Sequence, residues 1–181
     1  MNAPHPRFSA FSRLLHWLMA AMVLAMLFIG VAMVSTVSPM YVHLVAIHKP
    51  LGIAILALVI IRIVNRLLNR PPPLPADLPT IQKIAAKASH VVLYGLMLAL
   101  PIVGWSMLSA GDLPIVLFGT VRLPAILAPS PVLYADLRQL HTVLAYLFFL
   151  TIVVHIAAAL FHGLIRRDGV LGSMASWRLK K

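Results

Sequence analysis

Two histidines, His141 and His155, stand fourteen residues apart in a run from Gln139 to Ile165 that contains no charged residue. On an α-helix, fourteen residues advance roughly 21 Å and return to within about 40° of the starting face. The run is long enough to cross a bilayer, and an imidazole in hydrocarbon needs a partner. We therefore expect both rings on one side of one helix, near opposite membrane surfaces.

Partners for these rings are available, because His16 and His48 lie near the ends of other apolar runs. Four such histidines, two at each surface, are what two stacked b-type haems need. Zinc is a poorer match, because it takes three or four ligands and no Asp or Glu lies within an apolar run. Two helices that each supply one imidazole suit haem iron, whose porphyrin provides the other ligands. Covalent attachment is excluded, because the chain has no cysteine.

The elements that must position these histidines are strongly apolar. The chain of 181 residues is 61% hydrophobic and 10% charged, with a mean hydropathy of +0.97. Four runs are long enough to span a bilayer, at about residues 14–34, 42–65, 87–110 and 138–165. We expect an all-α integral membrane four-helix bundle that forms a single domain over residues 1–181.

Basic residues are distributed unevenly along the chain. Twelve of the 15 lie on one side: before the first span, around the loop between the second and third spans, or after the fourth, with Arg62 just inside the end of the second span. Lys49, Arg122 and Arg138 lie toward the opposite surface. The positive-inside rule therefore predicts that both termini are cytoplasmic. The net charge of +11 then reflects membrane topology, and we expect no binding to nucleic acid.

The connections between the spans differ in character. Five prolines within residues 71–79 predict an extended linker without an internal helix, with the third helix starting near Ala85. The segment 111–137 is longer and unusually apolar. It is expected to lie on the membrane surface or to fold over the end of the bundle.

The histidines separate into two levels when the N-terminus is placed inside. His48 and His141 are the one obvious deep pair at the outer level. The inner level has three deep candidates, His16, His90 and His155, and His162 lies closer to the surface. Depth alone leaves the inner pair open.

Short motifs in these runs resemble, in order, those of the bacterial cytochrome b-561 family. They are Arg13-x-x-His16-Trp17, Ile47-His48-x-x-x-Gly52, Ala99-Leu100-Pro101-x-x-Gly104, His141-Thr142 and His155-x-Ala157-Ala158. The resemblance covers nearly the whole chain, and the ordered set is specific although each motif alone is weak. It implies a di-haem b cytochrome of the bacterial inner membrane that exchanges electrons with ubiquinone.

The resemblance also implies which histidines bind iron. Carried over to matching positions, it pairs His16 with His155 at the inner haem and His48 with His141 at the outer haem. The outer pair agrees with the depth argument. At the inner haem the resemblance alone favours His16 over His90.

Further residues near the implied ligands are candidates for other contacts. His90 and His162 match family histidines that are not the usual axial ligands, and they are candidates for a quinone site beside the inner haem. Arg13, Lys49 and Arg138 stand within three residues of the implied ligands. They are candidates for contacts to haem propionates or to a small anion.

Two functions follow from the resemblance. Members of the family are linked to superoxide oxidation, which implies an oxidoreductase that passes electrons from superoxide outside to ubiquinone inside. The basic residues Lys49, Arg122 and Arg138 would then attract the anion. Related cytochromes of formate dehydrogenase and hydrogenase support an alternative, a relay subunit that couples a separate dehydrogenase or hydrogenase to the quinone pool. The two hypotheses differ in whether the chain is an enzyme by itself.

Overall fold

The computed structural model describes residues 7–117 and 119–175. Within them, four long helices are apolar enough to cross a membrane: α1 (Ala10–Ser35), α2 (Met40–Leu68), α3 (Thr80–Ala110) and α4 (Pro131–Leu160). The remaining elements are β1 (Val116–Leu117), β2 (Val121–Arg122), the π-helix η1 (Phe161–Arg166) that continues α4, and α5 (Val170–Ala175). The expected four-helix membrane fold is confirmed, with the addition of a short antiparallel hairpin.

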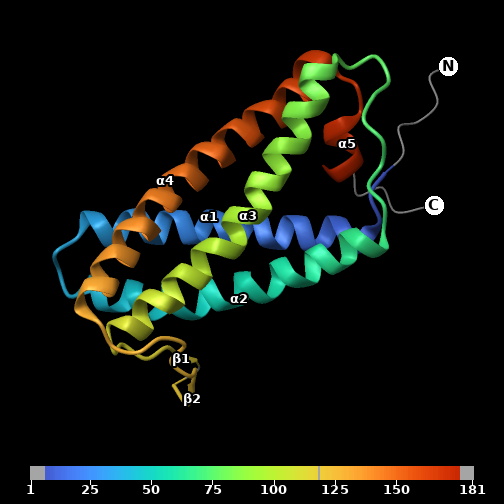
Figure 1. The fold of residues 1–181 in the computed structure, drawn as a ribbon. Helices are drawn as coiled ribbons and strands as arrows, with labels where there is room; N and C mark the ends of the chain where they lie inside the picture. The colour runs from blue at the N-terminus through green and yellow to red at the C-terminus, as the bar shows by residue number, and fades with distance from the viewer. Residues whose placement is uncertain (1–6, 118, 176–181) are drawn as a thin grey trace.

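The long helices pack as two antiparallel pairs, α1 with α2 and α3 with α4, and α2 also contacts α3 (Figure 1). We call one end of the bundle the terminal end. It contains the start of α1, the end of α4 and the short helix α5. The β1–β2 hairpin lies at the opposite end, here the hairpin end. At the terminal end, the Trp17 indole N–H donates to the carbonyl of Met174, which ties α1 to α5.

The centre of the bundle is a layer with one buried apolar residue from each long helix: Val23, Ile55, Leu96 and Phe148. Phe148 stands seven residues after His141 and seven before His155. This apolar layer therefore lies midway between the two histidine levels. Many large apolar side chains on the outside remain exposed, as expected where lipid is the solvent.

All four long helices begin earlier than the apolar runs predict, and α3 and α4 differ most. α3 starts at Thr80, directly after Pro79, and α4 starts at Pro131. Both extend beyond the apolar runs, because backbone hydrogen bonding and capping determine where a helix begins, whereas a run without charges marks only its membrane-spanning part. The start of α4 carries a readable signal. Ser130 accepts a hydrogen bond from the Leu133 amide, and proline occupies the first helical position.

The connections match their expected character in part. Residues 70–79 contain no helix, as the prolines predict. The segment after α3 folds over the end of that helix: the Trp105 indole donates to the Pro124 carbonyl at 3.0 Å, and the Ile126 amide donates to the Ser109 hydroxyl at 3.2 Å. This segment ends at residue 130, because the residues up to 137 belong to α4.

Candidate functional site

At the hairpin end, the structure brings together His48 of α2 and His141 of α4. Their ring centres are 6.3 Å apart, and the ring planes are inclined by 66°. Two imidazoles that hold one metal ion from opposite sides have ring centres about 6 Å apart, because each metal–nitrogen bond is about 2 Å long and each ring adds about 1 Å. The separation of this pair therefore fits one axially bound iron.

At the terminal end, His155 of α4 faces two other histidines. The ring of His16 on α1 lies 6.4 Å away at 67°, and the ring of His90 on α3 lies 5.6 Å away at 78°. The His16–His155 pair repeats the hairpin-end geometry almost unchanged. His155 thus contacts both of the other deep inner-level histidines, His16 and His90, so the structure brings these candidates together.

The second ring nitrogens distinguish the two partners of His155. The Nδ1 of His90 lies 2.6 Å from the Ala86 carbonyl, to which it donates. The Nδ1 of His16 lies 3.1 Å from Nη2 of Arg62 and accepts from it, because a guanidinium only donates. An imidazole that binds a metal through Nε2 keeps a proton on Nδ1 and donates it. His90 therefore already donates from Nδ1, as a metal-binding imidazole does. His16 can donate from Nδ1 only after its hydrogen bond with Arg62 is broken.

The surroundings of the paired histidines fit a flat, rigid group. A Cβ added at Gly30 or Gly95 would have no atom within 4 Å outside its own helix turn, so close helix packing does not account for these glycines. A Cβ at Gly104 would lie 3.3 Å from Cε1 of His141, so this glycine gives that ring its place against α3. The Nδ1 of His48 is buried and has no hydrogen-bond partner within the described residues. It is a donor still to be satisfied once Nε2 binds iron.

His162 lies in a separate polar group at the terminal end. On η1, its Nδ1 is 2.5 Å from Oδ2 of Asp168, and Nε of Arg166 is 2.9 Å from the same oxygen. Arg166 also pairs with Asp77 of the proline-rich loop at 2.6 Å. Burial alone would raise the pKa of the Asp168 carboxyl. Hydrogen bonds from His162 and from the Val170 amide, with the charge of Arg166, outweigh burial and hold that pKa below its usual value.

The three basic residues that neighbour the implied ligands have different surroundings. Arg13 donates from Nη1 to the Phe8 carbonyl at 2.7 Å, which fixes it at the start of α1. Lys49 is half-buried beside His48, and Arg138 is exposed on α4.

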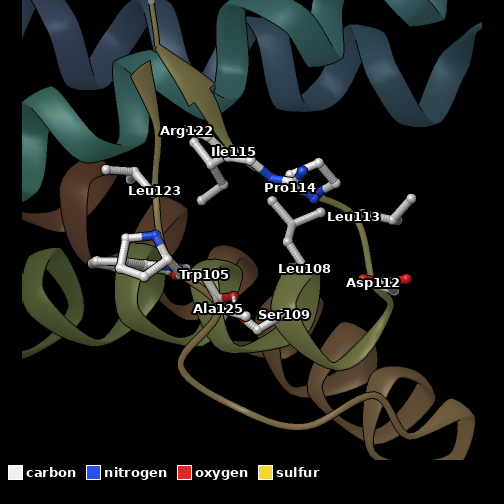
Figure 2. Close-up of a pocket in the computed structure, with 11 residues that line it drawn as sticks. Trp105, Leu108, Ser109, Asp112, Leu113, Pro114, Ile115, Arg122, Leu123 and Ala125 are labelled. Atoms are coloured by element: carbon white, nitrogen blue, oxygen red, sulfur yellow. Dashed lines mark hydrogen bonds between the residues drawn. The ribbon is translucent and has the colours of Figure 1, made fainter. Parts of the chain in front are cut away.

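The hairpin end holds a small pocket of about 60 Å³ between the end of α3 and the segment that folds over it (Figure 2). Asp112 and Arg122 line it together with apolar side chains. Acidic and basic residues therefore share this end. The hairpin end carries three basic residues, Lys49, Arg122 and Arg138, and two acidic ones, Asp112 and Asp136. Its net charge is therefore only one positive unit.

Arg62 is a site residue that sequence reasoning missed, since it was counted only as a charge that sets topology. It donates from Nε to the Tyr94 hydroxyl at 3.0 Å, in addition to its contact with His16. The signal for it was present. Arg62 follows His48 by fourteen residues, the spacing that separates His141 from His155.

Comparisons with known proteins show which family the chain is similar to. Residues 7–177 match the family model described as Prokaryotic cytochrome b561. The chain is 34% identical over 176 residues to Cytochrome b561 homolog 2 of Escherichia coli (strain K12), covering 96% of this chain and 93% of that protein. It is 34% identical over 126 residues to Probable superoxide oxidase CybB of Yersinia pestis, covering 69% and 70% of the two chains. It is 25% identical over 173 residues to Cytochrome b561 homolog 1 of E. coli (strain K12), covering 91% and 94%.

Proposed function

The chain belongs to the prokaryotic cytochrome b561 family, and on this basis we propose that it carries electrons across the bacterial inner membrane through two b haems and exchanges them with ubiquinone. Family membership makes it a membrane electron-transfer protein that binds haem b. The observation that carries the proposal is the repeated histidine pair, at 6.3 Å and 66° at one level and 6.4 Å and 67° at the other.

The proposed ligands are His48 with His141 at the hairpin end and His16 with His155 at the terminal end. The matching geometry of the two pairs and the family motifs favour His16 over His90. These histidines would hold the haems, and each haem would supply an iron that takes up and releases one electron. The apolar layer around Phe148 excludes water between the levels, which lie roughly 21 Å apart along α4.

We place the quinone site at the terminal end, next to His90. Reducing a quinone to a quinol consumes two electrons and two protons, so the site needs groups that exchange protons near neutral pH, as imidazoles do. His90 holds its Nδ1 proton against the Ala86 carbonyl and so presents Nε2 to a neighbour. His162, paired with Asp168, is a second proton-exchanging group at the same end of the bundle.

Superoxide is the proposed electron donor at the hairpin end. The support comes from the relative in Y. pestis, which is named a probable superoxide oxidase, and from the basic residues Lys49, Arg122 and Arg138. A net positive charge raises the local concentration of a small anion. Because Asp112 and Asp136 share this end, we expect the attraction to be modest.

Purification of the protein without partners tests this proposal. We expect two haems per chain, both extractable with acid–acetone because no cysteine holds them. Superoxide should reduce them, and an added ubiquinone analogue should reoxidise them. One haem per chain would contradict the paired ligands. Two haems that superoxide does not reduce, with a dehydrogenase that copurifies, would favour the electron-relay subunit.

The proposed orientation places the terminal end in the cytoplasm, because most basic residues gather there. A reporter enzyme that is active only in the cytoplasm should be active when it is fused near Pro75 or after Lys181. A reporter inserted within residues 111–131 should be active only outside the cytoplasm. The opposite pattern would reverse the two faces and place the superoxide reaction inside the cell.

A further inference from the structure

Arg62 is a positive charge within a membrane-spanning helix, at the level of the terminal-end histidines. Its spacing from His48 puts both residues on nearly one face of α2. Nη2 bonds Nδ1 of His16, Nε bonds the Tyr94 hydroxyl, and Nη1 is buried with no hydrogen-bond partner within residues 7–117 and 119–175. A charged group in hydrocarbon is strongly disfavoured unless it is paired. The guanidinium therefore lacks an anion.

Within the residues that the structure describes, no carboxylate pairs with Arg62. Of its four acidic residues, Asp77 and Asp168 pair with Arg166, whereas Asp112 and Asp136 lie toward the hairpin end. Asn65, three residues after Arg62 on α2, is neutral and donates to the Ser12 hydroxyl.

The immediate surroundings of Arg62 add positive charge. Both Arg62 and Arg66 lie over the ring of Tyr94, at 5.9 and 5.7 Å from its centre. All three residues line a cavity of about 20 Å³. Within the described residues, two cations thus share one site without a carboxylate.

Iron binding at His16 changes what Arg62 can contact. With Nε2 on a metal, Nδ1 keeps its proton and becomes a donor. Two donors, Nδ1–H and Nη2–H, would then face each other, and their present hydrogen bond could not persist. The two oxygens of a carboxylate would accept from Nη2 and from the unpartnered Nη1.

We propose that Arg62 holds a carboxylate of the haem bound between His16 and His155, and so positions that haem at the terminal end. This inference rests on the proposed function. A haem side chain is the favoured source of the carboxylate, because Arg62 lies beside the ligand and within the span, whereas lipid phosphates lie at the membrane boundary. The role is one of positioning and electrostatics, and His16 and His155 remain the ligands.

The test is a redox titration of the haem-loaded, full-length protein with Arg62→Gln, Arg62→Lys and Arg66→Gln. The His141→Ala protein identifies the terminal-end signal, since it retains only that haem. Loss of a nearby positive charge favours ferric iron. Arg62→Gln should therefore raise the ferric-to-ferrous ratio of the terminal-end haem about tenfold at a fixed potential, a fall of about 59 mV in its midpoint. Arg62→Lys keeps the positive charge, so its terminal-end midpoint should stay close to that of the unaltered protein.

Arg66→Gln is the matched control. Arg66 lies one helical turn after Arg62 and over the same Tyr94 ring, but it is Arg62 that bonds His16. We expect the terminal-end midpoint of Arg66→Gln to stay close to that of the unaltered protein. Selective loss of the terminal-end haem in Arg62→Gln, with Arg62→Lys retaining it, would also support the proposal. Unchanged midpoints, equal effects on both haems or an equal shift in Arg66→Gln would overturn it.

Haem dimethyl ester separates a haem carboxylate from a lipid phosphate. In protein loaded with this ester, the terminal-end haem should be retained as weakly as haem is in Arg62→Gln. The ester should weaken its retention no further in that variant, because both changes remove one interaction. Additive effects would assign the anion to lipid and overturn the proposal. An unaltered protein with fewer than two haems would instead contradict the proposed function.

Discussion

Replacing His141 with alanine is expected to halve the haem content, from two per chain to one. His141 is the α4 residue whose ring lies 6.3 Å from His48. An iron that loses one of two axial imidazoles is poorly retained, and no cysteine tethers the porphyrin. His48→Ala should remove the same haem. Haem extraction with protein quantification measures the stoichiometry, and a redox titration shows which haem remains.

A matched control lies on the same helix as His48. His43 is exposed on α2, five residues earlier, so His43→Ala should retain two haems. The sterically milder variant Gly104→Ala should hold less of the hairpin-end haem than the unaltered protein, because the new Cβ would lie 3.3 Å from the His141 ring. Two haems in His141→Ala would show that the hairpin-end site is built from other residues.

His155→Ala should likewise leave one haem per chain, with the terminal-end haem lost and the hairpin-end haem retained. The reason is that His155 faces both candidate partners, His16 at 6.4 Å and His90 at 5.6 Å. His16→Ala should give the same spectrum as His155→Ala. His90→Ala should keep two haems and instead slow the reduction of a ubiquinone analogue.

The reverse result at these two positions would be equally clear. If His90→Ala lost the terminal-end haem and His16→Ala kept it bound by two imidazoles, His90 would be the ligand. The Arg62–His16 hydrogen bond would then be compatible with bound haem. The proposed role of Arg62 would fail together with the assignment of His16.

Sequence alone determined the class of fold and the two histidine levels. In a bilayer, every backbone hydrogen bond of an exposed span must be satisfied within it, so an apolar run of about 20 residues predicts a helix directly. Helical rise is constant, so the spacing from His141 to His155 determines their relative depth without any tertiary information. The ordered motifs around these histidines placed the chain in its family for the same reason, since they are local in sequence.

Tertiary structure decided which side chains face one another at each depth. His16 and His90 both reach His155, and Arg62 bonds His16, because of how α1, α2 and α3 are rotated about their axes. Helices that are apolar on nearly every face carry only a weak signal of that rotation. The pairing of His162 with Asp168 depends in the same way on the turn that follows η1. Depth is a local property of one helix, whereas contact is a property of packed helices, and only the folded chain specifies it.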